Sequence, residues 1–266
     1  MKASILGCGW LGFPLAERLV QEGWMVQGST TTKDKAALLE TAGITPFLIS
    51  LTPELSGDDI RDFLRSEVLI INIPPGRRKE NVREFHVAQI RNLIAHIERS
   101  PVQFVVYVSS TSVYPDTDGV VVEEDAGHPK RPSGRALLEV EQLLMTHAHF
   151  ESTVLRFGGL YGPGRPLGRF LAGKKNLDNG EARVNLIHQE DCINIILEII
   201  SQNIRGEIFN ACADQHPRRR EMYPAAAARL GLQPPHFTED GGKAGKTVNS
   251  DKLKDKLGYR FKHQPG

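Results

Sequence analysis

The stretch Ile5-Leu6-Gly7-Cys8-Gly9-Trp10-Leu11-Gly12-Phe13-Pro14-Leu15 contains three glycines in the spacing G-x-G-x-x-G. An apolar run precedes them and an amphipathic segment follows, which predicts a strand, a turn and a helix. The first glycine permits a tight turn, the second leaves room for a pyrophosphate, and the third lets the helix pack against the strand. The helix N-terminus offers N–H groups to the anion. We therefore predict a dinucleotide-binding turn; the alternative is a glycine-rich turn that binds nothing.

The residues after the second predicted strand indicate which dinucleotide is preferred. An NAD site usually carries a carboxylate about 20 residues past the first glycine, where it binds the ribose hydroxyls. Between Glu22 and Asp34 the chain has no carboxylate and offers hydroxyls and a lysine. These groups favour the 2′-phosphate of NADP over NAD, whereas the alternative is a solvated loop whose threonines cap the next helix. The residues expected to contact the cofactor in these two segments are Gly7, Gly9, Trp10, Leu11, Gly12, Ser29, Thr30, Thr31 and Lys33.

The first half of the chain alternates predicted strands and helices. The strands are expected at 24–28, 45–51, 68–73 and 104–108, and the helices between them at 33–42 and 80–99. The run 68–73 is apolar throughout, which is typical of a parallel strand buried on both faces. We therefore predict a doubly wound parallel sheet of the Rossmann type. The strand ends that should line its ligand crevice include Ile73, Pro74, Pro75 and Ser109.

The second half is expected to form a smaller lobe. We predict that residues 1–160 form the dinucleotide-binding domain and that residues 161–266 form an α/β lobe interleaved with it. Strands near 154–157 and 207–210 should return to the main sheet.

The composition limits the function classes of the chain. The 266 residues carry a formal net charge of +1, which gives no reason to expect a nucleic acid or a membrane as partner. We expect neither a membrane span nor a signal peptide, because long apolar runs are absent from the sequence. Cys8, Cys192 and Cys212 lack metal-ligand spacing. They predict reduced thiols in a cytoplasmic protein without a metal site.

Three later motifs resemble those of a known enzyme family. They are Ser109-Ser110-Thr111-Ser112-Val113-Tyr114, the segment from Leu155-Arg156 to Tyr161-Gly162-Pro163-Gly164, and Asn185-Leu186-Ile187-His188-Gln189-Glu190-Asp191. Together with the glycine turn, they resemble the extended short-chain dehydrogenase/reductases, which include NAD(P)-dependent sugar-nucleotide epimerases and dehydratases. The resemblance implies an NAD(P)-dependent enzyme for a sugar nucleotide or a similar hydroxylated, anionic small molecule. It also implies a homodimer, because the family often pairs through the two helices after the fourth and fifth strands.

The proton-transfer residues of this family are altered in the chain. The family uses a tyrosine and a lysine four residues apart on a helix, assisted by a serine or threonine that the resemblance places at Ser110, with Thr111 beside it. The tyrosine and lysine positions fall on Ser133 and Leu137. A serine hydroxyl is far less acidic than a phenol, and leucine can neither donate a hydrogen bond nor carry charge. Arg135 cannot replace them, because a residue two positions away points to another helix face.

Other residues remain candidates for the chemistry and for substrate binding. Tyr114 could donate a proton, or it could shape the pocket wall. Tyr161 and His188 could face the substrate, or they could anchor a loop and brace the lobe. Arg165 and Arg169 follow a glycine-rich turn and suit an anionic substrate, because the guanidinium plane matches phosphate; solvated loop arginines are the alternative.

Two classes of function follow from the sequence. The first is an epimerase, dehydratase or reductase that departs from the usual proton chemistry. The second is a non-catalytic NAD(P)-binding sensor or interaction protein. The glycine turn supports both equally. Loss of the tyrosine and lysine favours the second, whereas retention of the other motifs modestly favours the first.

Overall fold

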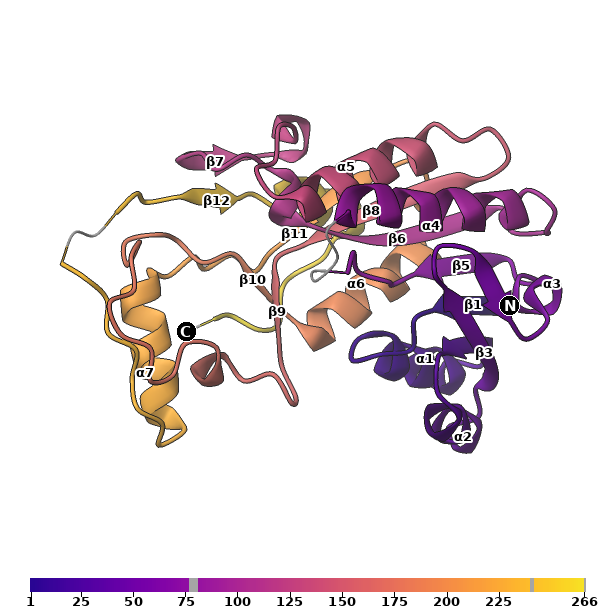
Figure 1. Cartoon of the computed structure of the whole chain (residues 1–266), viewed down its shortest axis with the longest axis horizontal. Helices are drawn as coiled ribbons and strands as arrows, with labels where there is room; N and C mark the ends of the chain where they lie inside the picture. The colour runs from indigo at the N-terminus through magenta and orange to yellow at the C-terminus, as the bar shows by residue number, and fades with distance from the viewer. Residues whose placement is uncertain (77–80, 240–241, 266) are drawn as a thin grey trace.

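The main body of the molecule is a single mostly parallel sheet. The computed structural model describes residues 1–76, 81–239 and 242–265. Within these residues the sheet has eight strands in the order β11-β8-β6-β5-β1-β2-β3-β4 (Figure 1). Only the pairing of β3 with β4 at one edge is antiparallel. The strands are β1 (Lys2–Leu6), β2 (Met25–Thr30), β3 (Thr45–Leu51), β4 (Leu55–Gly57), β5 (Val68–Ile71), β6 (Phe104–Ser110), β8 (Glu151–Phe157) and β11 (Ile208–Ala211).

The strand order confirms the predicted doubly wound sheet. From β1 the chain proceeds outward through β2 and β3, then returns to place β5 on the other side of β1. The direction of winding therefore reverses between β1 and β5. In open α/β sheets such a reversal leaves a crevice at the carboxyl ends of the two strands, where ligands bind.

Helices cover both faces of the sheet. The helices are α1 (Gly12–Gln21), α2 (Lys33–Thr41), α3 (Ile60–Phe63), α4 (Val82–Ile97), α5 (Pro132–Met145), α6 (Gln189–Ser201), α7 (Arg219–Arg229) and α8 (Asp251–Leu257). In Figure 1, α4 and α5 lie on one side of the strands and α1 and α6 on the other. The predicted helix 80–99 corresponds to α4, which is two residues shorter at its C-terminus, whereas Glu80 lies outside the described residues.

Strand β5 has the double burial that its apolar sequence predicts. Ile70 packs into the core that contains α1 and α6. Leu69 and Ile71, on the opposite face, pack into the core that contains α4 and α5. Alternation along an extended strand sends neighbouring side chains to opposite faces, so only a continuous apolar run fills both cores. No helix among the described residues is long and apolar enough to cross a membrane.

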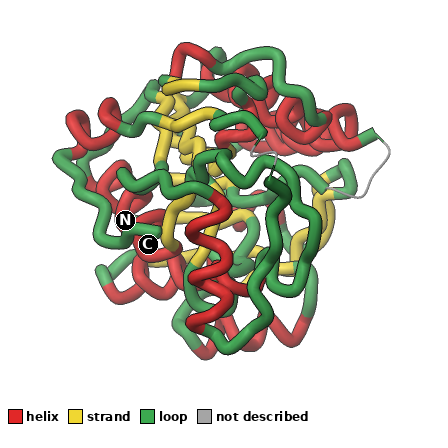
Figure 2. The backbone as a smooth tube through the Cα atoms, turned by 90° about the vertical axis from the view of Figure 1, so that its left-hand side faces the viewer, coloured by secondary structure: helices red, strands yellow, loops and turns green. Residues whose placement is uncertain are grey.

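A smaller lobe lies beyond the carboxyl ends of the strands. Its strands are β9 (Gly159–Tyr161), which pairs with β10 (Leu186–His188), and β12 (Lys246–Val248), which pairs with β7 (Gly119–Val121). A small core of Val184, Leu186 and Met222 joins β10 to α7. Figure 2 looks from this side, with α7 in front of the sheet. The lobe therefore stands over the edge of the sheet where the crevice opens.

Candidate functional site

The glycine turn after β1 has three different steric environments. Gly7 has a φ of +104°, and a Cβ there would lie 2.7 Å from Asn72 O. A Cβ on Gly12 would lie 2.2 Å from Gly7 O, because α1 approaches the turn closely. A Cβ on Gly9 would meet nothing within 4 Å. The first and third glycines are therefore required by the fold, whereas the second keeps open space at the mouth of the crevice.

Hydrogen bonds fix this turn to both neighbouring strands. Gly7 N donates to Ser29 Oγ at 2.8 Å, and Cys8 N donates to Ser29 O at 2.9 Å. On the other side, Asn72 Nδ2 donates to Gly7 O at 3.0 Å. Helix α1 begins at Gly12, and its N-cap residue Leu11 makes no side-chain hydrogen bond to it. The turn is thus held rigidly, with the positive end of the helix directed at the crevice.

Cys8 within the turn is a packing residue. It is free and buried, and burial raises the pKa of its thiol to about 12. A thiol with this pKa carries almost no thiolate near neutral pH, so Cys8 lacks the features of a reactive cysteine.

A cavity of about 300 Å³ lies beside the end of β2, and we call it the β2 cavity. It brings together most of the cofactor residues predicted near β1 and β2. Lys33, which begins α2, is not among its lining residues, whereas Lys35 is. Lys35 and the lining residues from β3 and α4 were not predicted from the sequence. The lining residues are Leu6, Gly7, Cys8, Gly9, Ser29, Thr30, Thr31, Lys35, Ile49, Ser50, Leu51, Thr52, Ile73 and Gln89.

A second cavity, of about 550 Å³, lies at the end of β5, and we call it the β5 cavity. Gly9 and Ile73 line both cavities, so the two meet at the glycine turn. The predicted Pro74, Pro75 and Ser109 also line the second one. Its lining residues are Gly9, Trp10, Leu11, Asn72, Ile73, Pro74, Pro75, Gly76, Val108, Ser109, Ser110, Ser112, Ser133, Leu137, Leu160 and Arg165.

The wall of the β5 cavity contains the two residues to which the family resemblance assigns the tyrosine and lysine positions. Ser133 and Leu137 lie one turn apart on α5, and both line the cavity. Among the described lining residues Arg165 is the sole charged side chain, and none is a tyrosine, lysine, histidine or carboxylate. Ser110 Oγ accepts a hydrogen bond from Ser112 N at 3.2 Å, which leaves the Ser110 proton free to donate. The cavity can thus bind hydroxyl and anionic groups, but its described wall offers no acid or base that titrates near neutral pH.

Tyr114 does not line either cavity. Its hydroxyl donates to Asn210 Oδ1 at 2.6 Å and accepts from Arg156 Nη1 at 3.0 Å. The residue is 2% exposed, and burial raises the pKa of the phenol to about 12. These surroundings do not support the role of proton donor that the sequence suggested, because the hydroxyl is engaged inside the protein.

Below the cavity wall lies a buried ion pair. Arg156 Nη2 lies 2.7 Å from Glu141 Oε2, and Arg156 Nε lies 3.1 Å from the same oxygen. The two side chains are 3% and 2% exposed. Arg156 also donates to Glu123 O, and Ser109 Oγ donates to Glu141 Oε1. The pair therefore connects α5 to β8, and its carboxylate engages the Ser109 hydroxyl in a hydrogen bond.

Four other predicted residues lie outside the lining of both cavities. Thr111 begins a 3₁₀ turn after β6, and the exposed Arg169 lies in another such turn. Tyr161 packs edge-on against His188 with ring centroids 5.1 Å apart. His188 Nδ1 accepts from Glu190 N at 3.2 Å and so caps α6. Burial, and then the neighbouring His263, lower the pKa of the His188 imidazole. These four residues therefore lie outside the two cavities that meet at the glycine turn.

Contacts between the glycine turn and the lobe cross the mouth of the crevice. The Arg165 guanidinium lies over the Trp10 indole, 4.4 Å from the ring centroid. Trp10 Nε1 donates to Pro163 O at 2.7 Å, and Gln189 Nε2 donates to Trp10 O at 2.6 Å. The contact of Gln189 could not be predicted from the sequence, because its partner Trp10 is 179 residues away in the chain. These contacts hold Arg165 against the wall of the β5 cavity.

Comparisons with known proteins identify relatives of the whole chain. Residues 4–212 match the model of the NAD dependent epimerase/dehydratase family. Protein YeeZ of Escherichia coli K12 is 38% identical over 266 residues, covering 98% of this chain and 96% of that protein. YeeZ is thus similar over nearly the full length of both chains.

Solved structures share the fold. A short-chain dehydrogenase/reductase superfamily protein from Agrobacterium tumefaciens with bound NAD is 18% identical, with a TM-score of 0.82 over 100% of this chain and 94% of that chain. A UDP-glucose 4-epimerase from Thermotoga maritima with UDP-glucose is 17% identical, with a TM-score of 0.79 over 99% and 94%. At these identities the likeness establishes the fold, and it confirms the predicted Rossmann-type architecture.

The buried ion pair predicts a large difference between two arginine substitutions. Arg156→Met leaves the Glu141 carboxylate buried without its partner, so we expect the free energy of unfolding to fall by about 3–5 kcal/mol. Arg18→Met breaks the exposed pair with Glu22 and should cost at most about 1 kcal/mol. Urea denaturation of both variants measures the difference. Equal stability of the two variants would contradict the assigned role of the pair.

Proposed function

The chain belongs to the NAD dependent epimerase/dehydratase family, and we propose that it binds NADP and acts on a sugar nucleotide or a similar hydroxylated, anionic substrate. The observation that carries the proposal is the open space at Gly9, between the two cavities and in front of the N-terminus of α1, whose N-cap residue Leu11 makes no side-chain hydrogen bond. The pyrophosphate would lie there, the adenosine end in the β2 cavity, and the nicotinamide with the substrate in the β5 cavity.

The lining of the β2 cavity supports NADP as the cofactor. Thr30, Thr31 and Lys35 offer hydroxyls and an ammonium group, and the described lining residues include no carboxylate. A ribose 2′-phosphate accepts hydrogen bonds from such donors, whereas a carboxylate would repel it. Lys35 is thus the proposed cationic partner of the 2′-phosphate, a role for which the sequence had suggested Lys33.

The lining of the β5 cavity supports an anionic substrate with hydroxyl groups. Arg165 supplies the positive charge, and the hydroxyls of Ser110, Ser112 and Ser133 supply short polar contacts. Solved structures of the same fold contain UDP-glucose or UDP-glucuronic acid, with NAD in some of them. A sugar nucleotide combines the two features, since its diphosphate suits a guanidinium and its sugar suits the serines.

The residues of the chain imply an atypical way of handling protons. A bound nicotinamide supplies the hydride chemistry of this family. Ser110, with its oxygen held by Ser112 N, can donate a hydrogen bond to a substrate hydroxyl. Ser133 can orient the substrate, but Leu137 cannot stabilise an anion in place of the lysine. The alternative function is a non-catalytic NAD(P)-binding sensor or interaction protein. Leucine in place of the family's lysine favours this alternative, because the usual proton transfer would then be lost.

The three free and buried cysteines support our proposal of a cytoplasmic location.

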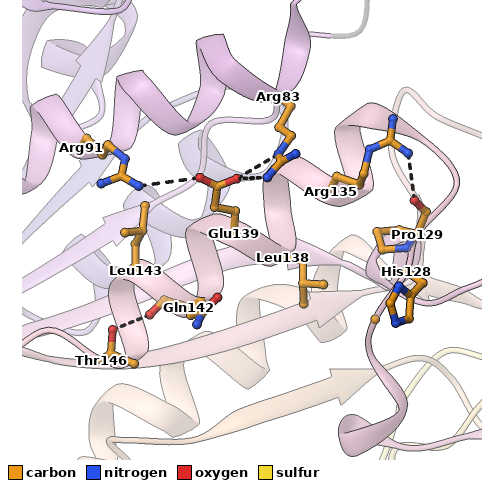
Figure 3. A pocket seen from close by; sticks show the side chains of 11 residues that line it. Arg83, Arg91, His128, Pro129, Arg135, Leu138, Glu139, Gln142, Leu143 and Thr146 are labelled. Atoms are coloured by element: carbon orange, nitrogen blue, oxygen red, sulfur yellow. Dashed lines mark hydrogen bonds and ion pairs between the residues drawn. The ribbon is translucent and has the colours of Figure 1, made fainter.

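We also propose a homodimer formed through α4 and α5. Their outer face carries a cavity of about 770 Å³ in which Arg83 and Arg91 converge on Glu139 (Figure 3). Arg83 Nη2 lies 2.8 Å from Glu139 Oε2, and Arg91 Nη2 lies 3.7 Å from Glu139 Oε1. Related enzymes often associate through these two helices.

Light scattering tests the dimer. The wild-type protein should have about twice the 29.5 kDa mass of one chain. Gln142→Lys adds a cation to the proposed interface, so the measured mass of this variant should fall toward that of the monomer. A monomeric wild-type protein would contradict the proposal.

Gly9→Val tests the position of the pyrophosphate. A side chain at Gly9 meets open space in the free protein, so the variant should fold with nearly wild-type stability. It should nevertheless lose NADPH binding by more than 100-fold, because the isopropyl group fills the place of the phosphates. Enhancement of nicotinamide fluorescence measures the binding. Wild-type affinity in the variant would contradict the assigned crevice.

A pair of lysine variants tests the cofactor preference. Lys35→Ala should weaken NADPH binding about tenfold and leave NADH binding unchanged, because it removes a charged partner of the 2′-phosphate. Lys33→Ala is the matched control and should change neither affinity. Fluorescence titrations with both dinucleotides give the comparison. Tighter binding of NADH than NADPH by the wild-type protein would rule out the NADP preference.

A pair of arginine variants separates the two functions. In the presence of NADP, UDP-glucose should bind the wild-type protein, and Arg165→Met should weaken it about 10–100-fold through loss of a charge-assisted hydrogen bond. Arg169→Met, outside the cavity lining, should bind like the wild type. Calorimetry measures the affinities, and chromatography of the incubated sugar nucleotide detects turnover. Binding of the cofactor without any UDP-sugar or related anion would favour the non-catalytic sensor.

A further inference from the structure

The last described segment of the chain docks onto the N-terminus of α6. Asp191 in the first turn of α6 accepts three hydrogen bonds from it. Tyr259 Oη donates at 2.7 Å, Lys262 N at 2.8 Å and His263 N at 3.1 Å. Asp191 is fully buried, so these bonds hold the segment firmly beside β10 and α6. His263 is thereby brought to His188 and Glu190, more than 70 residues earlier in the chain.

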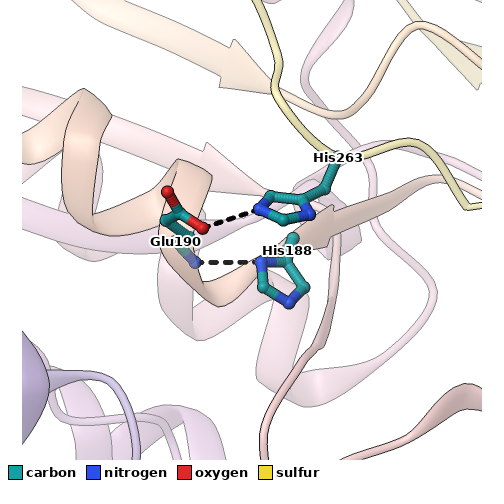
Figure 4. A group of neighbouring side chains, drawn as sticks. All are labelled: His188, Glu190 and His263. Atoms are coloured by element: carbon teal, nitrogen blue, oxygen red, sulfur yellow. Dashed lines mark hydrogen bonds and ion pairs between the residues drawn. The ribbon is translucent and has the colours of Figure 1, made fainter.

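Three potential metal ligands meet at this junction. One ligand atom from each of His188, Glu190 and His263 lies within 4.8 Å of the other two. His263 Nε2 lies 2.7 Å from Glu190 Oε2, and the two imidazole rings face each other with centroids 3.9 Å apart. In Figure 4, a nitrogen of His263 is turned toward the Glu190 carboxylate, and a nitrogen of His188 is turned toward the Glu190 main-chain nitrogen. Two imidazoles and one carboxylate thus converge from two separate segments of the chain.

This ligand set matches the chemistry of zinc and similar divalent transition metals. Imidazole nitrogen and carboxylate oxygen bind Zn²⁺ at about 2.0–2.2 Å, commonly with three protein ligands and a water. His188 Nδ1 accepts a hydrogen bond from Glu190 N, so the ring would bind a cation through Nε2, or through Nδ1 with that hydrogen bond given up. Lys262 Nζ, 3.4 Å from Glu190, is 56% exposed and can turn to solvent when a cation replaces it.

The junction is also accessible to an ion. His188 and Glu190 line a cavity of about 300 Å³ between α1 and the start of α6. Glu190 and His263 are exposed, at 50% and 36% of their side chains. A hydrated cation can therefore reach the cluster, and water can complete its coordination.

We propose that His188, Glu190 and His263 bind one divalent transition-metal ion of the zinc class, which ties the end of the chain to α6. The site is independent of the proposed cofactor, yet it adjoins the crevice. Gln189, between two of the ligands, donates through its side chain to Trp10 O in the glycine turn. The ion would thus stabilise the same junction that holds the turn to the lobe.

Metal titration of the full, tag-free chain tests the proposal. After removal of bound metal with a chelator, the protein should bind one equivalent of Zn²⁺ in competition with a chromophoric chelator. Bound Co²⁺ should give the visible absorption of a low-symmetry site. His263→Ala and Glu190→Gln should each weaken Zn²⁺ binding at least tenfold. His236→Ala, which removes an exposed histidine elsewhere in the lobe, should bind like the wild type.

A second measurement tests the tie between the two segments. Zn²⁺ should slow hydrogen exchange at the amides of Lys262 and His263 in the wild type, because these amides donate to Asp191 next to the ion. It should have no such effect in His263→Ala. Absence of Zn²⁺ binding by the wild type, or equal binding by all three variants, would overturn the site. Binding without slower exchange would overturn the tie.

Discussion

The close approach of α1 to the turn after β1 is the constraint on which the crevice depends. Gly12 lies so near Gly7 O that a methyl group does not fit between them, and Asn72 holds the same carbonyl from the end of β5. The helix N-terminus is therefore fixed at the point where the winding of the sheet reverses. Because these contacts involve backbone and an amide, the anion-binding geometry exists before any ligand arrives.

On α5, a buried contact that supports the fold lies next to the residues that line the β5 cavity. The buried pair of Arg156 and Glu141 joins α5 to β8 and needs no substrate to explain it. One and two turns earlier on the same helix, Leu137 and Ser133 line the β5 cavity, at the positions that the family resemblance assigns to the lysine and tyrosine. The residues that α5 contributes to this cavity are thus a hydroxyl and an apolar side chain, so membership of the family does not by itself define the reaction.

The sequence predicted the fold and many of the residues that line the two cavities, because their signals are local. Glycine spacing and the apolar run of β5 depend on a few neighbouring residues. The predicted start of the second helix at Lys33 agrees with α2. Lys35 was nevertheless missed, because the helix face that lines the β2 cavity depends on how α2 packs against the sheet, and two residues differ by more than half a helical turn. The burial of Tyr114 depends on Asn210, and the surroundings of His188 depend on His263; no periodicity connects such distant partners.

We propose a crevice that binds the cofactor beside a wall without the family's proton-transfer pair. A crystal structure of the complex with NADP tests both parts at once. We expect the pyrophosphate against Gly9 and the nicotinamide in the β5 cavity, with Ser133 and Leu137 as its neighbours on α5 and no tyrosine and lysine beside it. A nicotinamide bound next to a tyrosine and lysine pair, or a dinucleotide bound outside the crevice, would contradict the account.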